Sequence, residues 1–148
     1  MGQIVVENAH SRLKISRNET SATAYGVLND ERAKFEWISI VFINDAYCKG
    51  LNRRYLSHHY PTDVLSFRLN EGEEIEGEVY VNLDRASVQA RQHGVSFKNE
   101  VDRLVIHGLL HLLGYRDTTP ALKVRMKQKE DEYLRTNSAR NGRARKSH

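Results

Sequence analysis

Four short segments of the chain combine β-branched and aromatic residues in the alternating or continuous apolar patterns of strands. They are IVVE at residues 4–7, EWISIVFI at 36–43, DVLSFRL at 63–69 and GEVYVNL at 77–83. The connection between the last two segments, NEGEEIEG, is short and polar, which predicts a hairpin. These patterns predict one small four-stranded sheet.

Helical patterns occupy most of the remaining chain. The predicted helices cover residues 45–56 after the N-cap candidate Asn44, 84–92, 97–113 after Ser96 and 120–134 after Thr119, and a thinner pattern predicts another helix between Ser16 and Arg32. Because a helix separates the second strand from the third, these two strands are predicted to form a parallel pair. Together with the hairpin, this pair predicts a mixed sheet. The fold class is therefore α+β, a small mixed four-stranded sheet packed with about five helices.

The composition narrows the class of protein. With 148 residues, of which 39% are hydrophobic and 28% charged, the chain has the size of one domain with an ordinary core. No apolar run approaches the length of a membrane span, and the amino terminus lacks the layout of a signal peptide, so we expect no membrane association and a cytoplasmic location. Cys48 is the only cysteine, which excludes an internal disulfide and a thiolate zinc cage. Any metal must therefore be held by His, Asp or Glu.

The net charge of +4 is concentrated at the carboxyl end of the chain. Five basic residues and no acidic residue follow Glu132, so residues 1–132 carry 18 of the 23 basic residues and all 19 acidic ones. Residues 136–148 hold almost no apolar side chain. We therefore predict a single domain over residues 1–134 and a disordered basic tail over residues 135–148. The tail is interpreted either as a solubilising end or as an arm with weak, salt-dependent attraction for nucleic acid.

The segment VIHGLLHLLGYRDTTP at residues 105–120 carries the clearest chemical signal. His107 and His111 are four residues apart in an apolar helix, so both imidazoles project from one face, as two ligands of one metal ion do. Gly114 suits the end of this helix, after which Asp117 can point back over the last turn. Gly108, between the histidines, predicts a close approach of another backbone to the metal. Three ligands with one open position are typical of catalytic rather than structural zinc.

The alternative interpretation of this segment is structural. In it, the two histidines are partly buried and satisfied by hydrogen bonds, and Asp117 is a turn residue. Two unsatisfied imidazoles in so apolar a helix would each cost about 1 to 3 kcal/mol, and a shared metal ion removes that cost for both. This argument favours a metal site at the end of a central helix.

Three blocks of the chain resemble the YbeY family of metal-dependent endoribonucleases. HGLLHLLGY at 107–115 is similar to the family signature His-Gly-x-Leu-His-Leu-x-Gly-Tyr. LNRRYLSHHYPTDVLSF at 51–67 resembles the family's Leu-Asn-x-x-Tyr and Pro-Thr-Asp-Val-Leu-Ser-Phe segments, and GEVYVNLDRA at 77–86 resembles its third strand-forming block. The resemblance covers about residues 36–134. It implies cleavage of single-stranded RNA, a role in ribosomal RNA maturation and ribosome quality control, and one zinc ion per chain.

The resemblance also implies the metal ligands, which are the expected catalytic residues. His107 and His111 take the first two ligand positions, and Asp117 stands where the family usually has a third histidine. A carboxylate oxygen binds zinc at about 2.0 to 2.2 Å, so the site should survive this change.

A second departure from the family pattern concerns the substrate. Many members carry arginine after the tyrosine of the Leu-Asn-x-x-Tyr block, where this chain has Leu56. If that arginine holds phosphate, another basic residue must replace it here. The candidates for contact with RNA are Arg53, Arg54, His59 and Arg85.

The sequence leaves the mechanism and two other function classes open. The nucleophile is either a metal-bound water or the 2′-hydroxyl of the RNA. One alternative is a zinc hydrolase of a peptide or small amide, which the absence of a glutamate after His107 disfavours. The other is a noncatalytic, metal-stabilised ribosome-assembly factor. The expected partners are single-stranded or ribosomal RNA and ribosome-associated proteins, and the sequence predicts no obligate protein partner.

Overall fold

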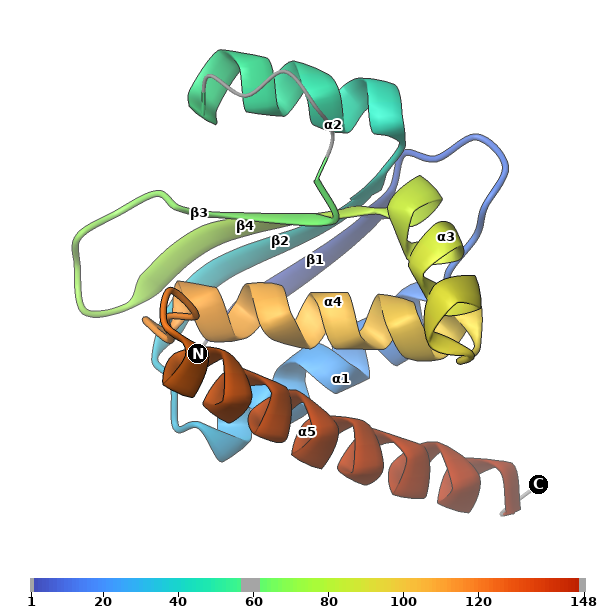
Figure 1. Cartoon of the computed structure of the whole chain (residues 1–148). Coiled ribbons are helices and arrows are strands. Elements are labelled where there is room, and N and C mark those ends of the chain that lie inside the picture. The colour runs from blue at the N-terminus through green and yellow to red at the C-terminus, as the bar shows by residue number, and fades with distance from the viewer. Residues whose placement is uncertain (1, 57–61, 147–148) are drawn as a thin grey trace.

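The computed structural model describes residues 2–56 and 62–146, and within them the strands form one sheet in the order β1-β2-β4-β3 (Figure 1). The strands are β1 (Gln3–Asn8), β2 (Phe35–Ile43), β3 (Val64–Arg68) and β4 (Ile75–Asn82). β2 pairs in parallel with both β1 and β4, whereas β3 pairs antiparallel with β4. The predicted mixed sheet and the hairpin between β3 and β4 are confirmed.

One part of the predicted topology is wrong. The sequence predicts that β2 and β3 form a parallel pair, but β4 lies between them and β3 runs in the direction opposite to β2. Val79 and Val81 of β4 are fully buried and stand in register with Ile40 and Phe42 of β2. β3, which ends at the exposed Arg68, is left at the edge. The hairpin thus places its more buried strand at the centre of the sheet, an arrangement that adjacency in the sequence does not reveal.

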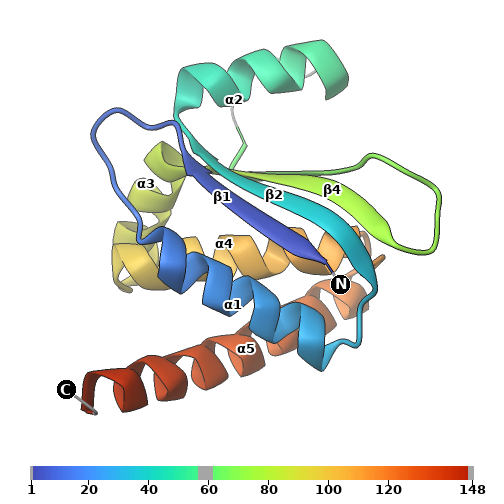
Figure 2. The same cartoon turned by 180° about the vertical axis from the view of Figure 1, so that it is seen from behind.

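The helices form layers on the two faces of the sheet. They are α1 (Arg17–Asp30), α2 (Asp45–Leu51), α3 (Leu83–His93), α4 (Phe97–Leu112) and α5 (Pro120–Lys146), with a π-helical turn, η1 (Asn52–Leu56), after α2. α1 and α4 lie along one face, α5 lies outside them, and α2 covers the opposite face (Figures 1 and 2). The predicted α+β class is confirmed.

Side-chain caps set where several of these helices begin. Asn44 and Ser96 accept hydrogen bonds from backbone N–H groups in the first turns of α2 and α4, and Thr119 does the same for α5. Ser16 caps α1 in the same way. The starts of these helices therefore follow from local sequence. None of the helices in the described part of the chain combines the length and the apolar character that crossing a membrane requires.

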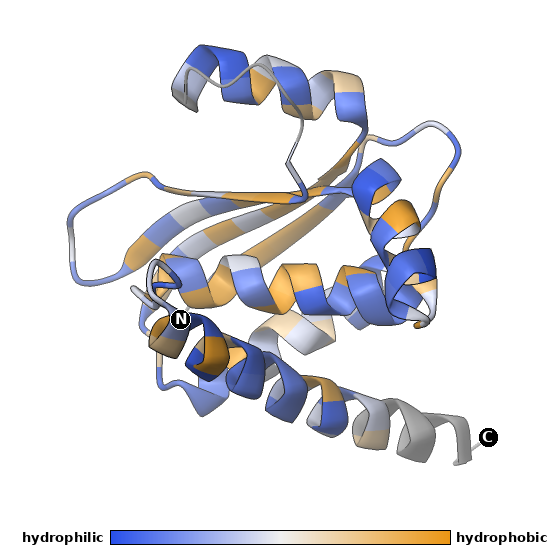
Figure 3. Cartoon of the chain, viewed as in Figure 1, coloured by the Kyte–Doolittle hydropathy of each residue, from blue (hydrophilic) through white to orange (hydrophobic). Residues whose placement is uncertain are grey.

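The main core lies between the sheet and α4. Figure 3 shows apolar residues concentrated on the strands and on α4, whereas α5 is largely hydrophilic. Ile38 and Ile40 of β2 and Leu109 and Leu110 of α4 are fully buried. This burial makes α4 the element most firmly held against the sheet, and it is also the helix that carries both histidines of the motif.

Gly108 brings α4 close to the sheet. A Cβ atom at this position would lie 2.5 Å from Cγ1 of Val79 and 3.2 Å from both Oγ of Ser66 and Cγ2 of Val64. The hydroxyl of Ser66 also donates a hydrogen bond to the Gly108 carbonyl, at 2.8 Å. The close approach at Gly108 is therefore made by side chains of the sheet, and the prediction that another backbone approaches a metal there is wrong.

The carboxyl-terminal segment differs from its predicted state. α5 continues to Lys146, so the predicted disorder from residue 135 is wrong as far as the described residues extend. Asn137 is 4% exposed, donates a hydrogen bond to Asp102 of α4 at 3.0 Å and accepts one from Thr23 of α1 at 2.8 Å. A buried polar contact, rather than apolar side chains, joins this part of α5 to the domain. The apolar pattern of the sequence does not reveal such a contact.

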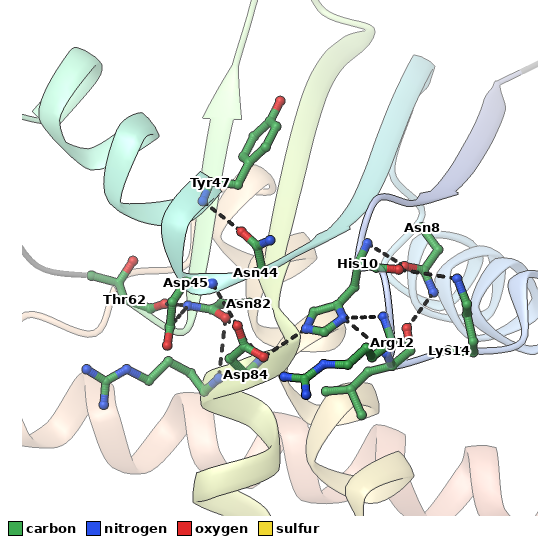
Figure 4. Close-up of polar contacts among 12 residues, drawn as sticks. Asn8, His10, Arg12, Lys14, Asn44, Asp45, Tyr47, Thr62, Asn82 and Asp84 are labelled. Atoms are coloured by element: carbon green, nitrogen blue, oxygen red, sulfur yellow. Dashed lines mark hydrogen bonds and ion pairs between the residues drawn. The ribbon is translucent and has the colours of Figure 1, made fainter.

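A polar network at the carboxyl ends of β1, β2 and β4 fixes the chain segment that enters β3 (Figure 4). Asn82 is fully buried and accepts a hydrogen bond from the backbone N–H of Asp84, which caps α3. Its amide donates to Oδ1 of Asp45 at 2.8 Å and to the Thr62 carbonyl at 3.0 Å. His10, from the loop after β1, contacts Asp84 at 2.8 Å. The segment before β3 is therefore tied to the starts of α2 and α3.

Candidate metal centre

His107 and His111 project from one face of α4 toward the loop that follows it. Their Nε2 atoms are 3.0 Å apart, and their ring centroids are 4.5 Å apart. The two side chains are 22% and 30% exposed, so solvent reaches them although most of α4 is buried. The helical spacing of four residues accounts for this pairing.

The chain after α4 turns so that Asp117 faces the two histidines. Gly114 has a φ of +99°, in the left-handed region that favours glycine, and the N–H of Tyr115 bonds back to a carbonyl in the last turn of α4 at 3.0 Å. Oδ2 of Asp117 then lies 3.6 Å from Nε2 of His107 and 3.5 Å from Nε2 of His111. The structure thus brings together the three residues that the sequence singles out.

Glu31, the residue that follows α1, binds the loop that carries Asp117. It accepts hydrogen bonds from Tyr115 at 2.5 Å, from Lys129 at 2.9 Å and from Tyr133. Burial raises the pKa of the Glu31 carboxyl, but the hydrogen bonds from the two tyrosines and Lys129 outweigh burial and hold the pKa below its ordinary value. An ionised Glu31 therefore links α5 to the loop that carries Asp117.

The geometry of the three residues fits a small metal ion. A tetrahedral ion with bonds of about 2.0 to 2.1 Å separates its ligand atoms by about 3.3 to 3.4 Å. The observed separations of 3.0, 3.5 and 3.6 Å lie on either side of that value. Metal ions are commonly held by three or more His, Cys, Asp or Glu side chains. In the described part of the chain, His107, His111 and Asp117 form such a group, and their ligand atoms all lie within 4.8 Å of one another. Small side-chain movements would suffice to seat an ion.

Glu130 of α5 contacts the histidine pair, and the sequence does not single it out. Nδ1 of His107 lies 2.6 Å from Oε2 of Glu130, and Oε1 of the same carboxylate accepts a hydrogen bond from Arg103 at 2.8 Å. An ionised carboxylate can only accept, so the proton of His107 is on Nδ1 and the lone pair of Nε2 faces Asp117 and His111. A carboxylate in this position orients metal-binding histidines in proteins. Glu130 is 23 residues from His107, and no local motif connects the two.

The electrostatics of the site favour a cation. Burial lowers the pKa of His107, but the hydrogen bond and the charge of Glu130, together with the charges of Asp117 and Asp63, raise the pKa above its ordinary value. The same negative surroundings that stabilise a protonated imidazole also stabilise a metal cation.

A cavity of about 540 Å³ opens beside the candidate metal ligands, and His107 and Asp117 line it. It is lined by Asp63 from the segment before β3, by Gln89 and His93 from α3, by His107 from α4 and by Lys123 from α5, among others. This volume lies in the range of about 300 to 1,000 Å³ that is typical of ligand sites. The ligand cluster is therefore open to a substrate considerably larger than water.

The predicted substrate-binding residues do not gather at this cavity. Arg53 and Arg54 are exposed on η1, which follows α2 on the face of the sheet opposite α4 (Figure 1). Arg85 is exposed on α3, and none of these three arginines lines the cavity. His59 lies outside the described residues. The structure therefore offers no support for a phosphate contact by the three arginines at this site.

Comparison with known proteins identifies the family. A family model described as Endoribonuclease YbeY matches residues 5–138. The chain is 44% identical to the Endoribonuclease YbeY of Chloroherpeton thalassium over 108 residues, which cover 73% of this chain and 77% of the relative. The corresponding protein of Salinibacter ruber is 39% identical over 138 residues, with 87% and 88% covered. A Thermotoga maritima protein solved in solution has a similar structure, with a TM-score of 0.70 at 26% identity over 93% of this chain and 91% of that one. With its fold, its histidine motif and these relatives in agreement, the chain belongs to the YbeY endoribonuclease family.

Proposed function

We propose that this chain is a zinc-dependent endoribonuclease that cleaves single-stranded RNA, with one zinc ion per chain bound by His107, His111 and Asp117. The observation that carries the proposal is the convergence of two imidazole nitrogens and one carboxylate oxygen beside a cavity of about 540 Å³. Two imidazoles favour zinc over magnesium, which prefers oxygen ligands. Membership of the family supports RNA as the substrate.

The protein's own residues prepare the site for this reaction. When bound, the ion supplies Lewis-acid stabilisation of the charge that builds up on the phosphodiester oxygens. Glu130 holds the proton of His107 on Nδ1, and Arg103 fixes the second oxygen of Glu130. Glu31 holds the loop that presents Asp117. Two of the three proposed ligands, His107 and Asp117, are thus positioned by contacts that are already present before the ion binds.

We propose that Asp63 accepts a proton from the nucleophile. It lines the same cavity as His107, and its charge is among those that raise the pKa of His107. The described partner of its carboxylate is the neutral amide of Gln89, at 3.3 Å. We expect Asp63→Asn to lower kcat while zinc content stays unchanged. An unchanged kcat would exclude this role.

The central test measures metal content and RNA cleavage on one preparation. The purified chain should contain about one zinc ion, cleave an end-labelled single strand faster than a duplex, lose cleavage with a chelator and regain it with zinc. A 2′,3′-cyclic phosphate on the product would identify attack by the 2′-hydroxyl, and its absence would identify attack by water. Undiminished cleavage after complete metal removal would refute the mechanism.

A pair of histidine variants provides the matched control. His111→Ala should lose both zinc and cleavage. His93 lines the same cavity, but its imidazole is 57% exposed and contacts Glu100 rather than the ligand cluster. His93→Ala should therefore keep its zinc. Equal loss of zinc in both variants would contradict the ligand assignment, and digestion of casein by the zinc-loaded protein would redirect the function toward peptide hydrolysis.

Membership of the family supports a proposal for the cellular role. We infer that the substrate is ribosomal RNA during maturation and quality control in the cytoplasm, where ribosome-associated proteins are the expected partners. A bacterial strain that lacks its own family member should accumulate ribosomal RNA with unprocessed ends. Wild-type chain should restore processing and His111→Ala should not, whereas restoration by His111→Ala would favour a noncatalytic assembly factor.

A further inference from the structure

The walls of the cavity beside the metal ligands differ in chemistry. α4 contributes five lining residues, α3 contributes two glutamines among others, and α5 contributes four residues that we call the α5 wall. Lys123, Met126 and Lys127 of α5 line the cavity at a spacing of i, i+3 and i+4, so they share one face of that helix. Met126 is 3% exposed, whereas both lysines are exposed. The lysines therefore form a basic rim above an apolar base.

The two lysines are free to take an external anion. Within the described part of the chain, neither has an ion pair or a side-chain hydrogen bond. By contrast, Lys129 on the same helix binds Glu31 at 2.9 Å. An unpaired lysine at a cavity rim presents a hydrated ammonium group on a flexible stem, which suits contact with phosphate.

The charge balance of the cavity depends on the metal. Four carboxylates and three cationic side chains line it, so with neutral histidines the lining carries a net charge of −1. A divalent ion at the ligand cluster changes that charge to +1. A polyanion is therefore attracted to the loaded site and repelled by the empty one.

We propose that Lys123 and Lys127 form a phosphate-binding site that holds the RNA strand beside the scissile phosphodiester. The inference deepens the proposed function and rests on it. Positions i and i+4 are about 6 Å apart along a helix, so each ammonium can contact a different phosphate of one strand. The strand then lies along the α5 wall, with its bases toward the glutamines of α3.

The test compares RNA binding by matched variants of the zinc-loaded chain. The probe is a fluorescent single-stranded 2′-O-methyl oligoribonucleotide, whose integrity is checked on a gel after each measurement. The double variant Lys123→Ala, Lys127→Ala should bind about tenfold more weakly at low salt, and the slope of log affinity against log salt should fall by about 1.4, or about 0.7 for each lost phosphate contact. In cleavage assays, KM should rise with little change in kcat.

Arg125 is the control residue. It is exposed on α5 but lies two positions from each lysine, so it points away from their common face. Arg125→Ala should leave the salt slope within about 0.3 of wild type, less than half the effect of one contact. Equal slope changes in the lysine and Arg125 variants would overturn the site in favour of general charge attraction, as would an unchanged slope in the double variant. If the wild type cleaves RNA and the double variant has the same RNA affinity and salt slope, only the lysine site is refuted. If the zinc-loaded wild type neither binds nor cleaves RNA, the proposed function is refuted.

Discussion

Replacing Glu130 by glutamine tests whether a residue of α5 orients His107, which is proposed as a metal ligand. The carboxylate of Glu130 accepts two hydrogen bonds at once, from Arg103 on Oε1 and from Nδ1 of His107 on Oε2. Glutamine replaces one of these two oxygens by an NH2 donor, so only one of the two donors keeps its acceptor in place. If the oxygen stays with Arg103, the amide NH2 faces Nδ1 of His107 and favours the tautomer with the proton on Nε2. A protonated Nε2 has no free lone pair, so it cannot bind a metal.

The contact between Glu130 and His107 sets the expected loss of zinc affinity in Glu130→Gln. Removing a carboxylate that supports a metal-binding histidine typically lowers metal affinity about 10- to 100-fold. This range corresponds to about 1.4 to 2.7 kcal/mol. Glu130 is 6% exposed, so the mismatched donor also has little access to water, and we expect the free energy of unfolding to fall by about 1 to 3 kcal/mol.

The assay is competition for zinc against a chromophoric chelator, with circular dichroism to show that the variant is folded. Asp131→Asn is the matched control, because Asp131 accepts a hydrogen bond from Arg103 at 2.5 Å but does not contact His107. Its zinc affinity should stay within about twofold of wild type, a change of about 0.4 kcal/mol. A folded Glu130→Gln protein with wild-type zinc affinity would refute the argument, and an equal loss in the Asp131 variant would assign the effect to the Arg103 network instead.

Three further predictions concern the loop and the packing around the site. Asp117→Ala should lower zinc affinity severely whereas Asp117→His should keep the metal, and equal zinc stoichiometry and affinity in both variants and the wild type would show that Asp117 is only a turn residue. Gly108→Ala should destabilise the fold by about 1 to 3 kcal/mol in urea unfolding, because its Cβ would lie 2.5 Å from Cγ1 of Val79, whereas Gly50→Ala, with no atom within 4 Å, should be neutral or slightly stabilising. Because the folded-state pKa of Glu31 is below its ordinary value of 4.5, the stability that its charge contributes is present above that value and is lost as the pH falls through the depressed one. Urea unfolding of the wild type should therefore lose more stability on acidification below 4.5 than that of Glu31→Gln, and identical losses would exclude a stabilising charge at this position.

Local sequence was sufficient for the elements of the fold and for part of the site. Capping side chains at Asn44, Ser96 and Thr119 act on the first turn that follows them, so the starts of three helices could be predicted within a residue. The pairing of His107 with His111 depends only on the helical repeat, so it could also be predicted. In each case the interacting groups are fewer than five residues apart.

Tertiary structure decided the features whose partners are distant in the chain. The position of β4 between β2 and β3 depends on which hairpin strand buries more apolar surface against β2. α5 continues past residue 135 to Lys146, and Asn137 on this part of the helix contacts Thr23 and Asp102. At the site, Glu130 reaches His107 only because α5 packs on α4. The distance from Asp117 to the histidines also depends on a loop held from α1 by Glu31. The residues in these contacts are far apart in the sequence, so no local pattern predicts that they meet. They come close only when the core packs the helices together.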